Sequence, residues 1–294
     1  MRGVAIPLGC ARMTGRALPR DIWDESFEEG ERRMKRRMLG QASTGLLGGF
    51  DVMMGLLVVI VLTGALSTVT TGELAHAIGA LPFGLAFVFL TIGRAELFTE
   101  NFFVPVAAVL AGRGSKRELG RMWTAAIVFN FVGIIVLAAI LTIDGVLPQS
   151  ALDAAGDLGD KFVGRGFVDG LASAIIAGTA MTLFTWLSLA ARSETTQVLA
   201  ALLVGYVLLL PVLNHVVVSF GELMIAIFAG TTEAGLWDIC WRIAVAATGN
   251  TIGGIGFITA TRLVQVSGEP HDAEHAKKTS SRDTVVFPRS GPRE

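Results

Sequence analysis

Long apolar stretches alternate with short polar connections along this chain. The segment from Val52 to Gly72 carries no charged residue over 21 positions, and the segment from Met122 to Ile143 carries none over 22. At ~1.5 Å per helical residue, each segment is long enough to cross a hydrocarbon core of ~30 Å. The pattern therefore predicts an all-α integral membrane protein with the lipid bilayer as its surroundings.

Six apolar regions fall into two kinds. Four have the length of a single span, namely residues 42–67, 119–143, 167–191 and 237–261. The regions 74–112 and 196–230 are too long for one crossing and too short for two crossings with a turn. Each also carries polar residues near its middle and a nearby proline, which interrupts helical hydrogen bonding. We therefore expect the second and fifth spans to be broken, beside protein or a water-filled cavity that satisfies the irregular backbone.

The order of these regions predicts an internal repeat, because an ordinary, a broken and an ordinary span occur twice in succession. The stretch "VAAVLAG" aligns with "LMIAIFAG" at an offset of 118, and "FNFVG" aligns with "GNTIG" at an offset of 120, which places Asn130 opposite Asn250. A unit of three spans must lie upside down when it is repeated once, and such repeats bring their discontinuous helices together near the midplane. The expected fold is six transmembrane helices in two inverted three-helix repeats.

Basic residues predict the orientation of this arrangement. With six spans, 20 of the 24 lysines and arginines fall on one side of the membrane, 2 on the other and 2 within spans. The positive-inside rule then places both termini in the cytoplasm and the aspartate-rich third loop outside, in a multi-pass protein of the cell membrane. The expected organisation is a cytoplasmic segment over 1–41, a membrane domain over 42–266 and a disordered polar tail over 267–294.

Composition changes this picture little. The net charge of −1 is a sum that says nothing about partners, and the two cysteines show no metal-ligand spacing. No cofactor, metal or nucleic-acid partner is therefore expected.

Three short motifs resemble the formate/nitrite transporter family: "AELFTEN" at 95–101, "NHVVVSF" at 214–220 and "TGNTIGG" at 248–254. The resemblance covers roughly residues 42–266. It implies an aquaporin-like protomer in a homopentamer, and a transport protein rather than an enzyme. Each protomer would carry its own pore for a small monovalent anion such as formate or nitrite, or for its conjugate acid.

The resemblance also implies roles for particular residues. Thr99 and His215 correspond to the central polar pair of the pore, with Asn214 and Asn250 as further polar pore groups. Two apolar constrictions would flank the pair, an inner one at Leu97 and Phe98 and an outer one at Phe83, Phe87 and Leu208.

The chain departs from the family pattern at three places. Asn214 stands where the family often has an acid, and Gly178 or Thr179 stands where it has an asparagine in the fourth span. Glu100 adds an acid directly after the Leu-Phe-Thr triplet. These departures leave the identity of the substrate and the preference for anions open.

Three charged residues lie in the first break. We expect Arg94 and Glu96 to be structural, either paired with each other or capping exposed helix ends. Glu100 is either structural or faces the cytoplasmic vestibule, where an acid would oppose the entry of anions. Thr99 and His215 have structural interpretations as well, because a threonine often caps a helix and a buried histidine can serve packing alone.

The chemistry expected of this pore follows from dehydration. A bare anion between apolar constrictions loses much of its hydration energy, whereas its conjugate acid is far cheaper to move. A central histidine, with an unperturbed pKa of ~6.5, can donate a proton to a weak-acid anion or attract it as a cation. Proton-coupled transport is the hypothesis; a facilitator of water or small neutral solutes and a non-transporting scaffold or sensor stay open as alternatives.

Overall fold

The computed structural model describes residues 17–268, and the secondary structure of that part is entirely helical. Within it, five helical stretches are long and apolar enough to cross a membrane. Four of them are α2 (Met38–Ser67), α6 (Lys116–Leu141), α8 (Phe167–Ala190) and the continuous stretch Leu236–Ser267. That last stretch contains α11 (Leu236–Thr251), the π-helical segment η3 (Ile252–Thr259) and α12 (Ala260–Ser267).

The first long region is broken, as expected. Its first part consists of α3 (Gly72–Gly79), η1 (Leu81–Phe83) and α4 (Gly84–Gly93), and the chain resumes with η2 (Phe98–Phe102) and α5 (Val104–Leu110). Arg94 ends α4 in the left-handed conformation, with φ 59°. Pro105 lies in the first turn of α5, where a missing N–H costs no helical bond. The break therefore precedes the proline.

The second long region is broken in the same manner. It consists of α9 (Glu194–Leu209) and α10 (Val216–Phe228), separated by a non-helical link. The link contains Pro211 and Val212, the latter with a positive φ of 51°. A β-branched residue at positive φ is a strained conformation that the surrounding packing must hold in place.

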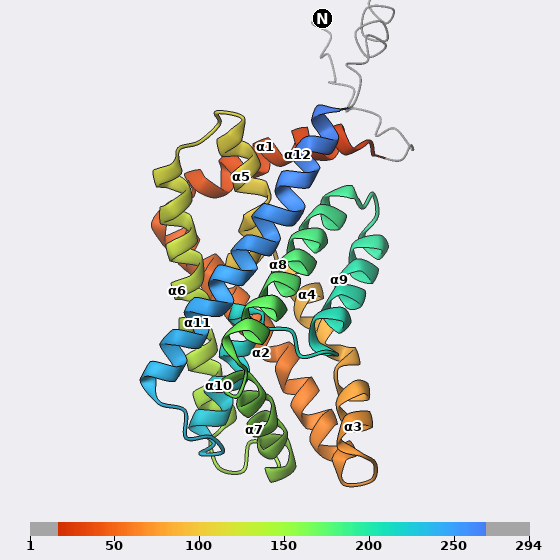
Figure 1. Cartoon of the computed structure of the whole chain (residues 1–294), viewed down its shortest axis with the longest axis vertical. Helices are drawn as coiled ribbons and strands as arrows, with labels where there is room; N and C mark the ends of the chain where they lie inside the picture. The colour runs from red at the N-terminus through yellow and green to blue at the C-terminus, as the bar shows by residue number, and fades with distance from the viewer. Residues whose placement is uncertain (1–16, 269–294) are drawn as a thin grey trace, which may run out of the picture.

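Two further helices lie in segments that the hydropathy pattern did not resolve. One is α1 (Pro19–Lys35), which packs against α5, and the other is α7 (Gln149–Val163), which packs against α10 and α2. Figure 1 shows α1, α5 and α12 at the upper end of the molecule, where the described chain begins and ends and which is called here the terminal side, and α3 and α7 at the opposite side. The helix α1, which lies within the segment expected over 1–41, thus packs directly against α5. The expected disordered tail lies almost wholly outside the described residues.

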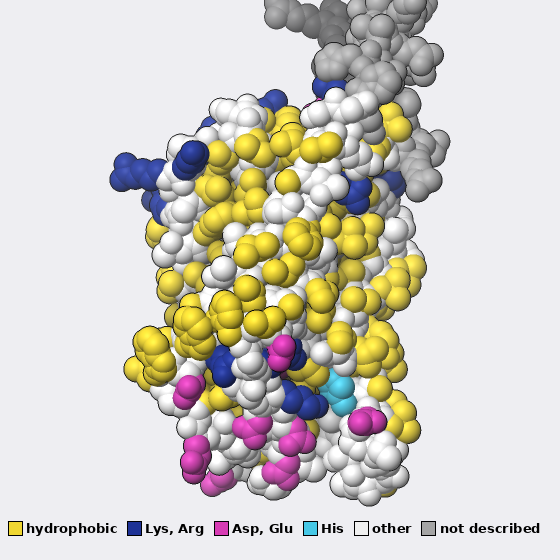
Figure 2. All heavy atoms as spheres, in the orientation of Figure 1, with side chains coloured by type: hydrophobic (Ala, Val, Ile, Leu, Met, Phe, Trp, Pro, Cys, Tyr) yellow, Lys and Arg dark blue, Asp and Glu magenta, His cyan; other side chains and the backbone are white. Residues whose placement is uncertain are grey.

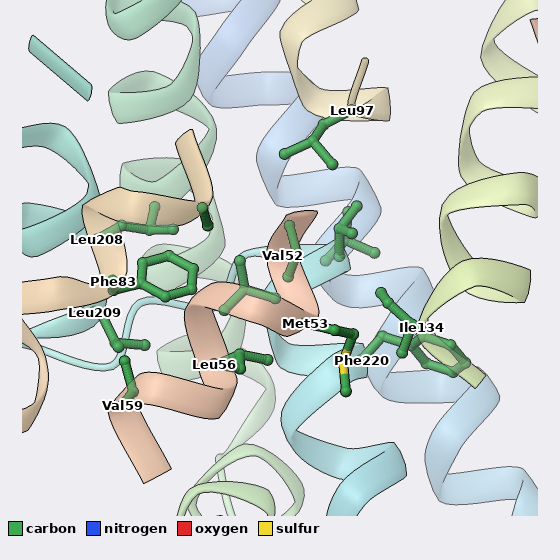
Figure 3. Packing of buried hydrophobic residues seen from close by; sticks show 14 of the residues in the cluster. Val52, Met53, Leu56, Val59, Phe83, Leu97, Ile134, Leu208, Leu209 and Phe220 are labelled. Carbon is green, nitrogen blue, oxygen red and sulfur yellow. The ribbon is translucent and has the colours of Figure 1, made fainter. Parts of the chain in front are cut away.

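Close helix contacts hold the breaks in place. At Gly48 and Gly49 of α2, an added Cβ would collide with the carbonyl oxygens of Glu96 and Asn130 respectively. Only glycine lets α2 approach both the first break and α6 at this distance. Figure 3 shows the buried side chains around this helix, including Val52, Met53 and Leu56.

The surface follows the same division into ends and middle. Figure 2 shows hydrophobic side chains over the middle of the visible face and most visible acidic side chains toward the opposite side. Basic side chains lie toward the terminal side and also between the hydrophobic band and the acidic end. Many large apolar side chains outside the core are exposed, among them Phe89, Ile92 and Leu203. Such a band matches the apolar surroundings that the sequence predicts.

Candidate functional site

The two helix breaks meet at a buried pair of polar side chains. Thr99 lies in η2, His215 is the N-terminal cap of α10, and neither side chain is exposed. Thr99 Oγ1 lies 2.7 Å from His215 Nε2. The structure thus brings together the two residues that the resemblance implied as the central pair, although 116 positions separate them in the chain.

Local hydrogen bonds determine where His215 carries its proton. The backbone N–H of Val218 donates to His215 Nδ1 over 3.2 Å, so Nδ1 must present a lone pair. The ring proton of the neutral imidazole therefore lies on Nε2, which donates to Thr99 Oγ1. Because Thr99 accepts this bond, its own hydroxyl hydrogen remains free to donate to a third group. The result is a directed chain of donors that ends at the Thr99 hydroxyl.

Asn130 of α6 supports the first break from behind. Its Oδ1 accepts the N–H of Phe98 over 2.9 Å, and its Nδ2 donates to the carbonyl oxygens of Glu96 and Gly45 over 3.0 and 2.7 Å. These bonds satisfy backbone groups that the break leaves without helical partners. The repeat offset paired Asn130 with Asn250, but no motif of the sequence marked Asn130 as a site residue.

Asn250 of α11 supports the second break with equivalent bonds. Its Oδ1 accepts the N–H of Val216 over 2.9 Å, and its Nδ2 donates to the carbonyl oxygens of Asn214 and Ala174 over 2.9 and 2.8 Å. Both amide hydrogens of Asn250 are therefore bound to backbone. Asn250 thus supports the second break and has no amide hydrogen left to donate to another group.

Asn214 points its side chain toward α8. Its Nδ2 donates to the carbonyl oxygen of Gly170 over 2.9 Å, and its backbone N–H donates to Ser173 Oγ over 3.0 Å. The side-chain oxygen Oδ1 is buried and has no hydrogen-bond partner among the described residues. The polar face of Asn214 is thus only partly satisfied by the protein.

The aromatic residues expected at the outer constriction pack together. The rings of Phe83 and Phe87 meet edge to face with centroids 5.6 Å apart, and Phe87 stacks on Phe184 at 5.3 Å. Leu208 joins them from α9, which packs against η1. Figure 3 shows Phe83 beside Leu208, with Leu97 well apart from both. All five residues expected at the two constrictions are buried, namely Phe83, Phe87, Leu97, Phe98 and Leu208.

Phe98 lies in a second aromatic group. Its ring meets those of Phe102 and Trp123 edge to face, with centroids 5.0 and 6.1 Å apart. Trp123 of α6 also donates its Nε1–H to the carbonyl oxygen of Asn101 over 3.0 Å. The first break is therefore anchored to α6 by aromatic contacts as well as by Asn130.

The charges of the first break have partners different from those expected. Glu96 Oε1 lies 2.7 Å from Arg36 Nη1 and 3.4 Å from Arg33 Nε, whereas Arg94 is exposed and forms no salt bridge among residues 17–268. Of the two arrangements expected for Arg94 and Glu96, their pairing with each other is not formed, since Glu96 pairs with Arg36 and Arg33 instead. Glu100 is buried, and its Oε2 accepts the N–H of Leu97 over 3.3 Å.

Two cavities approach the central pair from opposite ends. The terminal-side cavity has a volume of about 270 Å³ and is lined by residues of α1, α4 and α8 together with Glu96 and Glu100. The opposite-side cavity has a volume of about 790 Å³ and is lined by residues of α2, α3 and α7 together with Arg165 and Val212. Neither cavity is lined by Thr99 or His215, and both of these side chains are fully buried.

Curated relatives match nearly the whole chain. The uncharacterized transporter YrhG of Bacillus subtilis (strain 168) is 25% identical over 275 residues, which cover 89% of this chain and 98% of that protein. The inner membrane protein YfdC of Escherichia coli (strain K12) is 23% identical over 285 residues, which cover 96% of this chain and 88% of that protein.

Solved structures share the fold. A structure described as an FNT family ion channel has a TM-score of 0.75 at 17% identity and covers 83% of this chain and 98% of its own. A structure described as a pentameric formate channel with formate bound has a TM-score of 0.65 at 19% identity and covers 77% of this chain and 96% of its own. The model of the formate/nitrite transporter family matches residues 20–264. The chain therefore belongs to the formate/nitrite transporter family.

Proposed function

We propose that this protein is a channel or transporter for formate, nitrite or a similar small weak-acid anion. The observation that carries the proposal is the buried contact of Thr99 Oγ1 with His215 Nε2, 2.7 Å apart, where the two helix breaks meet between two cavities. A buried polar pair at membrane depth is rare unless it serves function. The formate bound to a structural neighbour agrees with this chemistry.

The proposal includes six spans in two inverted repeats. Asn130 and Asn250 support this arrangement, because each accepts the first N–H after a break and donates to the carbonyl two residues earlier. Equivalent bonds at positions 120 residues apart are what a repeated three-helix unit produces. The assembly proposed is a homopentamer, since a pentameric neighbour shares the fold.

The proposed pore holds an anion by donors that are already oriented. Two helices begin at the central pair, and the N-terminal end of a helix favours negative charge. The free hydroxyl hydrogen of Thr99 supplies a hydrogen bond to the anion, and His215 behind it fixes the direction of that hydroxyl. The apolar side chains at Phe83 and Phe87 and at Leu97 and Phe98 are proposed to exclude water and larger solutes on either side.

Proton coupling is proposed to act through the bond between His215 and Val218. A doubly protonated ring would have to release the Val218 N–H, because Nδ1 would then carry a hydrogen of its own. We infer that the neutral ring is the resting state and that an entering anion, by its charge, favours uptake of a proton at Nδ1. The doubly protonated ring would then pass its Nε2 proton to the Thr99 oxygen while Thr99 gives its hydroxyl hydrogen to the anion, which leaves the ring neutral with its proton on Nδ1. The anion would leave as its conjugate acid, for which the apolar constrictions are a smaller barrier. The ring would return to its resting form by releasing the Nδ1 proton and taking up one at Nε2, so that one proton from solvent leaves with each anion.

The test is formate uptake into proteoliposomes by the parent and two variants. His215→Phe keeps the bulk of the ring but removes both nitrogens, and we expect it to lose nearly all uptake. His215→Asn keeps one acceptor and one donor, so we expect reduced uptake that no longer changes across pH 5 to 8 beyond the change in formic acid itself, a range that brackets the ordinary histidine pKa of ~6.5.

Two outcomes would refute different parts of the proposal. Parent protein that is folded and pentameric yet passes neither formate, nitrite nor acetate would favour a scaffold or sensor, and water flux alone would favour a facilitator of neutral solutes. Uptake by both variants with the pH profile of the parent would make His215 a structural residue.

A further inference from the structure

The two halves of the chain place an arginine at each break in a similar way. Arg36 lies just before α2 and donates to Thr44 Oγ1 over 3.2 Å; the carbonyl of Thr44 accepts the N–H of Glu96 over 3.3 Å. Arg165 lies just before α8 and donates to Ser173 Oγ over 2.6 Å; the same hydroxyl oxygen accepts the N–H of Asn214 over 3.0 Å. Each arginine is thus linked through a hydroxyl residue to the residue at the end of a break.

The charge at these two positions differs. Glu96 neutralises Arg36, with Oε1 and Nη1 2.7 Å apart. The corresponding residue of the second break is Asn214, whose amide carries no charge. Within residues 17–268, Arg165 forms no salt bridge with any carboxylate, although Glu222 and Asp169 stand near enough to act on it electrostatically. The guanidinium of Arg165 therefore keeps a positive charge that no directly bound carboxylate within residues 17–268 neutralises.

Arg165 is also accessible to a ligand. It lines the opposite-side cavity together with Lys161 and His76, while Glu73 and Asp157 contribute the acids of that cavity. Its hydrogen bonds run to Ser173 and to the carbonyl oxygen of Val212, and a guanidinium has more N–H groups than these bonds use. Figure 2 shows basic side chains and a histidine at the surface between the hydrophobic band and the acidic end.

The terminal-side cavity, unlike the opposite-side cavity, has buried carboxylates beside the break that it approaches. Glu96 and Glu100 line it, and both are buried. Arg33, which lines it as well, is already bound to Glu29 over 2.8 Å and to Glu96 over 3.4 Å. An anion that arrives from this side meets the exposed Arg94 and two buried carboxylates, Glu96 and Glu100. An anion that arrives from the opposite side meets Arg165, a guanidinium with N–H groups to spare.

We propose that Arg165 forms a capture site for a small monovalent oxyanion, a carboxylate or nitrite, in the opposite-side cavity. The planar fork of a guanidinium matches two oxygens of such an anion. Asn214 is the specificity-determining residue of the site, because an acid there would occupy Arg165 as Glu96 occupies Arg36. The pore is thereby polarised, with higher anion affinity at the opposite side than at the terminal side. This inference rests on the proposed function.

The test compares formate influx from each side in proteoliposomes whose protein orientation is known. Asn214→Asp supplies the missing carboxylate, and we expect the half-saturating formate concentration from the opposite side to rise about tenfold, with a smaller change from the terminal side. Asn214→Ala is the matched control, since it loses the same bond to Gly170 without adding charge. The difference between the two variants isolates the effect of the carboxylate.

A second pair of variants separates the guanidinium from the general charge of the cavity. Arg165→Gln should weaken formate affinity at both low and high salt, because the direct contact is lost. Lys161→Gln removes an exposed charge of the same cavity, and its effect should disappear at about 1 M salt, where the Debye length is ~3 Å.

Binding measured without transport keeps this inference distinct from the proposed function. Calorimetric titration of the detergent-solubilised pentamer with formate should show weaker binding for Asn214→Asp and Arg165→Gln than for the parent, even if the parent transports nothing. Equal affinity in folded parent and Asn214→Asp protein, or equal half-saturation from the two sides in the parent, would overturn the proposal.

Discussion

At the scale of single residues, the proposed function depends on the contact between Thr99 and His215. Val218 fixes the lone pair of Nδ1, Nε2 donates to Thr99, and the Thr99 hydroxyl is the last donor in the chain. The orientation of that hydroxyl thus follows from backbone geometry at the start of α10. A substitution of Thr99 or His215 should therefore alter flux according to the hydrogen bond that it removes.

The first prediction concerns Thr99. Thr99→Val keeps the shape but removes the hydroxyl, which leaves the Nε2–H of His215 buried without an acceptor at a cost of about 1–3 kcal/mol. We expect formate flux to fall at least about tenfold, in proportion to the loss of one charge-assisted hydrogen bond. Thr99→Ser retains the hydroxyl and should keep most of the flux, measured in proteoliposomes of equal protein content. Equal flux in the Val and Ser variants would contradict the donor chain.

The second prediction concerns the asparagines behind the breaks. Asn130→Ala and Asn250→Ala each remove three hydrogen bonds to buried backbone groups, which we expect to lower the free energy of unfolding by about 3 kcal/mol or more. The measurement is the midpoint of thermal unfolding in detergent. Thr251→Ala, which removes one part-buried hydroxyl bond on α11, serves as control. A large effect at one asparagine and none at the other would count against their equivalence.

At the scale of elements, α1 is tied to the first break by ion pairs rather than by apolar contact alone. Arg33 and Arg36 both reach Glu96, and Glu29 holds Arg33 in place from within α1. Burial raises the pKa of Glu29, but hydrogen bonds and attraction from Arg32 and Arg33 outweigh burial and lower the pKa to about 2. A carboxylate whose pKa is lowered in the folded protein stabilises the fold at pH values above its ordinary pKa.

The third prediction is the pH dependence of this docking. The contribution of Glu29 is complete above pH 4.5, its ordinary pKa, and is lost as the pH falls toward 2. We expect hydrogen exchange of the α1 amides, corrected for intrinsic rates, to be steady from pH 7 to 5 and to speed up below about 4.5. The effect should be modest, since the pair is partly exposed to solvent. Glu29→Gln should show faster exchange at pH 7 and a flatter profile; a steady profile in the parent down to pH 2.5 would contradict the prediction.

At the scale of the whole molecule, the described helices arrange two cavities around one closed centre. The terminal side holds α1, α5 and the end of α12, and the opposite side holds α3 and α7 (Figure 1). The uneven distribution of basic residues supports the proposal that the terminal side faces the cytoplasm. The polarity inferred for Arg165 and Glu96 then favours entry of anions from outside the cell.

The fourth prediction tests this orientation. In protein whose two native cysteines are replaced by serine, Asp144→Cys and Lys116→Cys place single thiols at exposed positions on opposite ends. A membrane-impermeant maleimide added to intact cells should label position 144, whereas position 116 should react only after the membrane is permeabilised. Labelling of position 116 alone in intact cells would mean that the terminal side faces outward. Labelling of both positions in intact cells would refute the expected topology.

The sequence by itself determined the membrane class, the two broken regions and the family. These features are local: an apolar run of sufficient length forms a helix in lipid whatever its neighbours are, and polar residues with a proline interrupt it. The motifs around Thr99 and His215 are equally local, so the resemblance was enough to single out both residues as a candidate pair. The helices α1 and α7 were not predicted, because short amphipathic helices beside long apolar runs have only a weak hydropathy pattern.

Only the tertiary structure decided which of these residues touch. The contact of Thr99 with His215 spans 116 positions, and Glu96 takes its partners from α1 and the residue just after it rather than from its neighbour Arg94. Asn250 was expected to face the pore, yet its amide hydrogens bind backbone carbonyls. Hydrogen bonds and ion pairs act over a few ångströms, so their partners depend on how distant segments pack, and no local pattern encodes that choice.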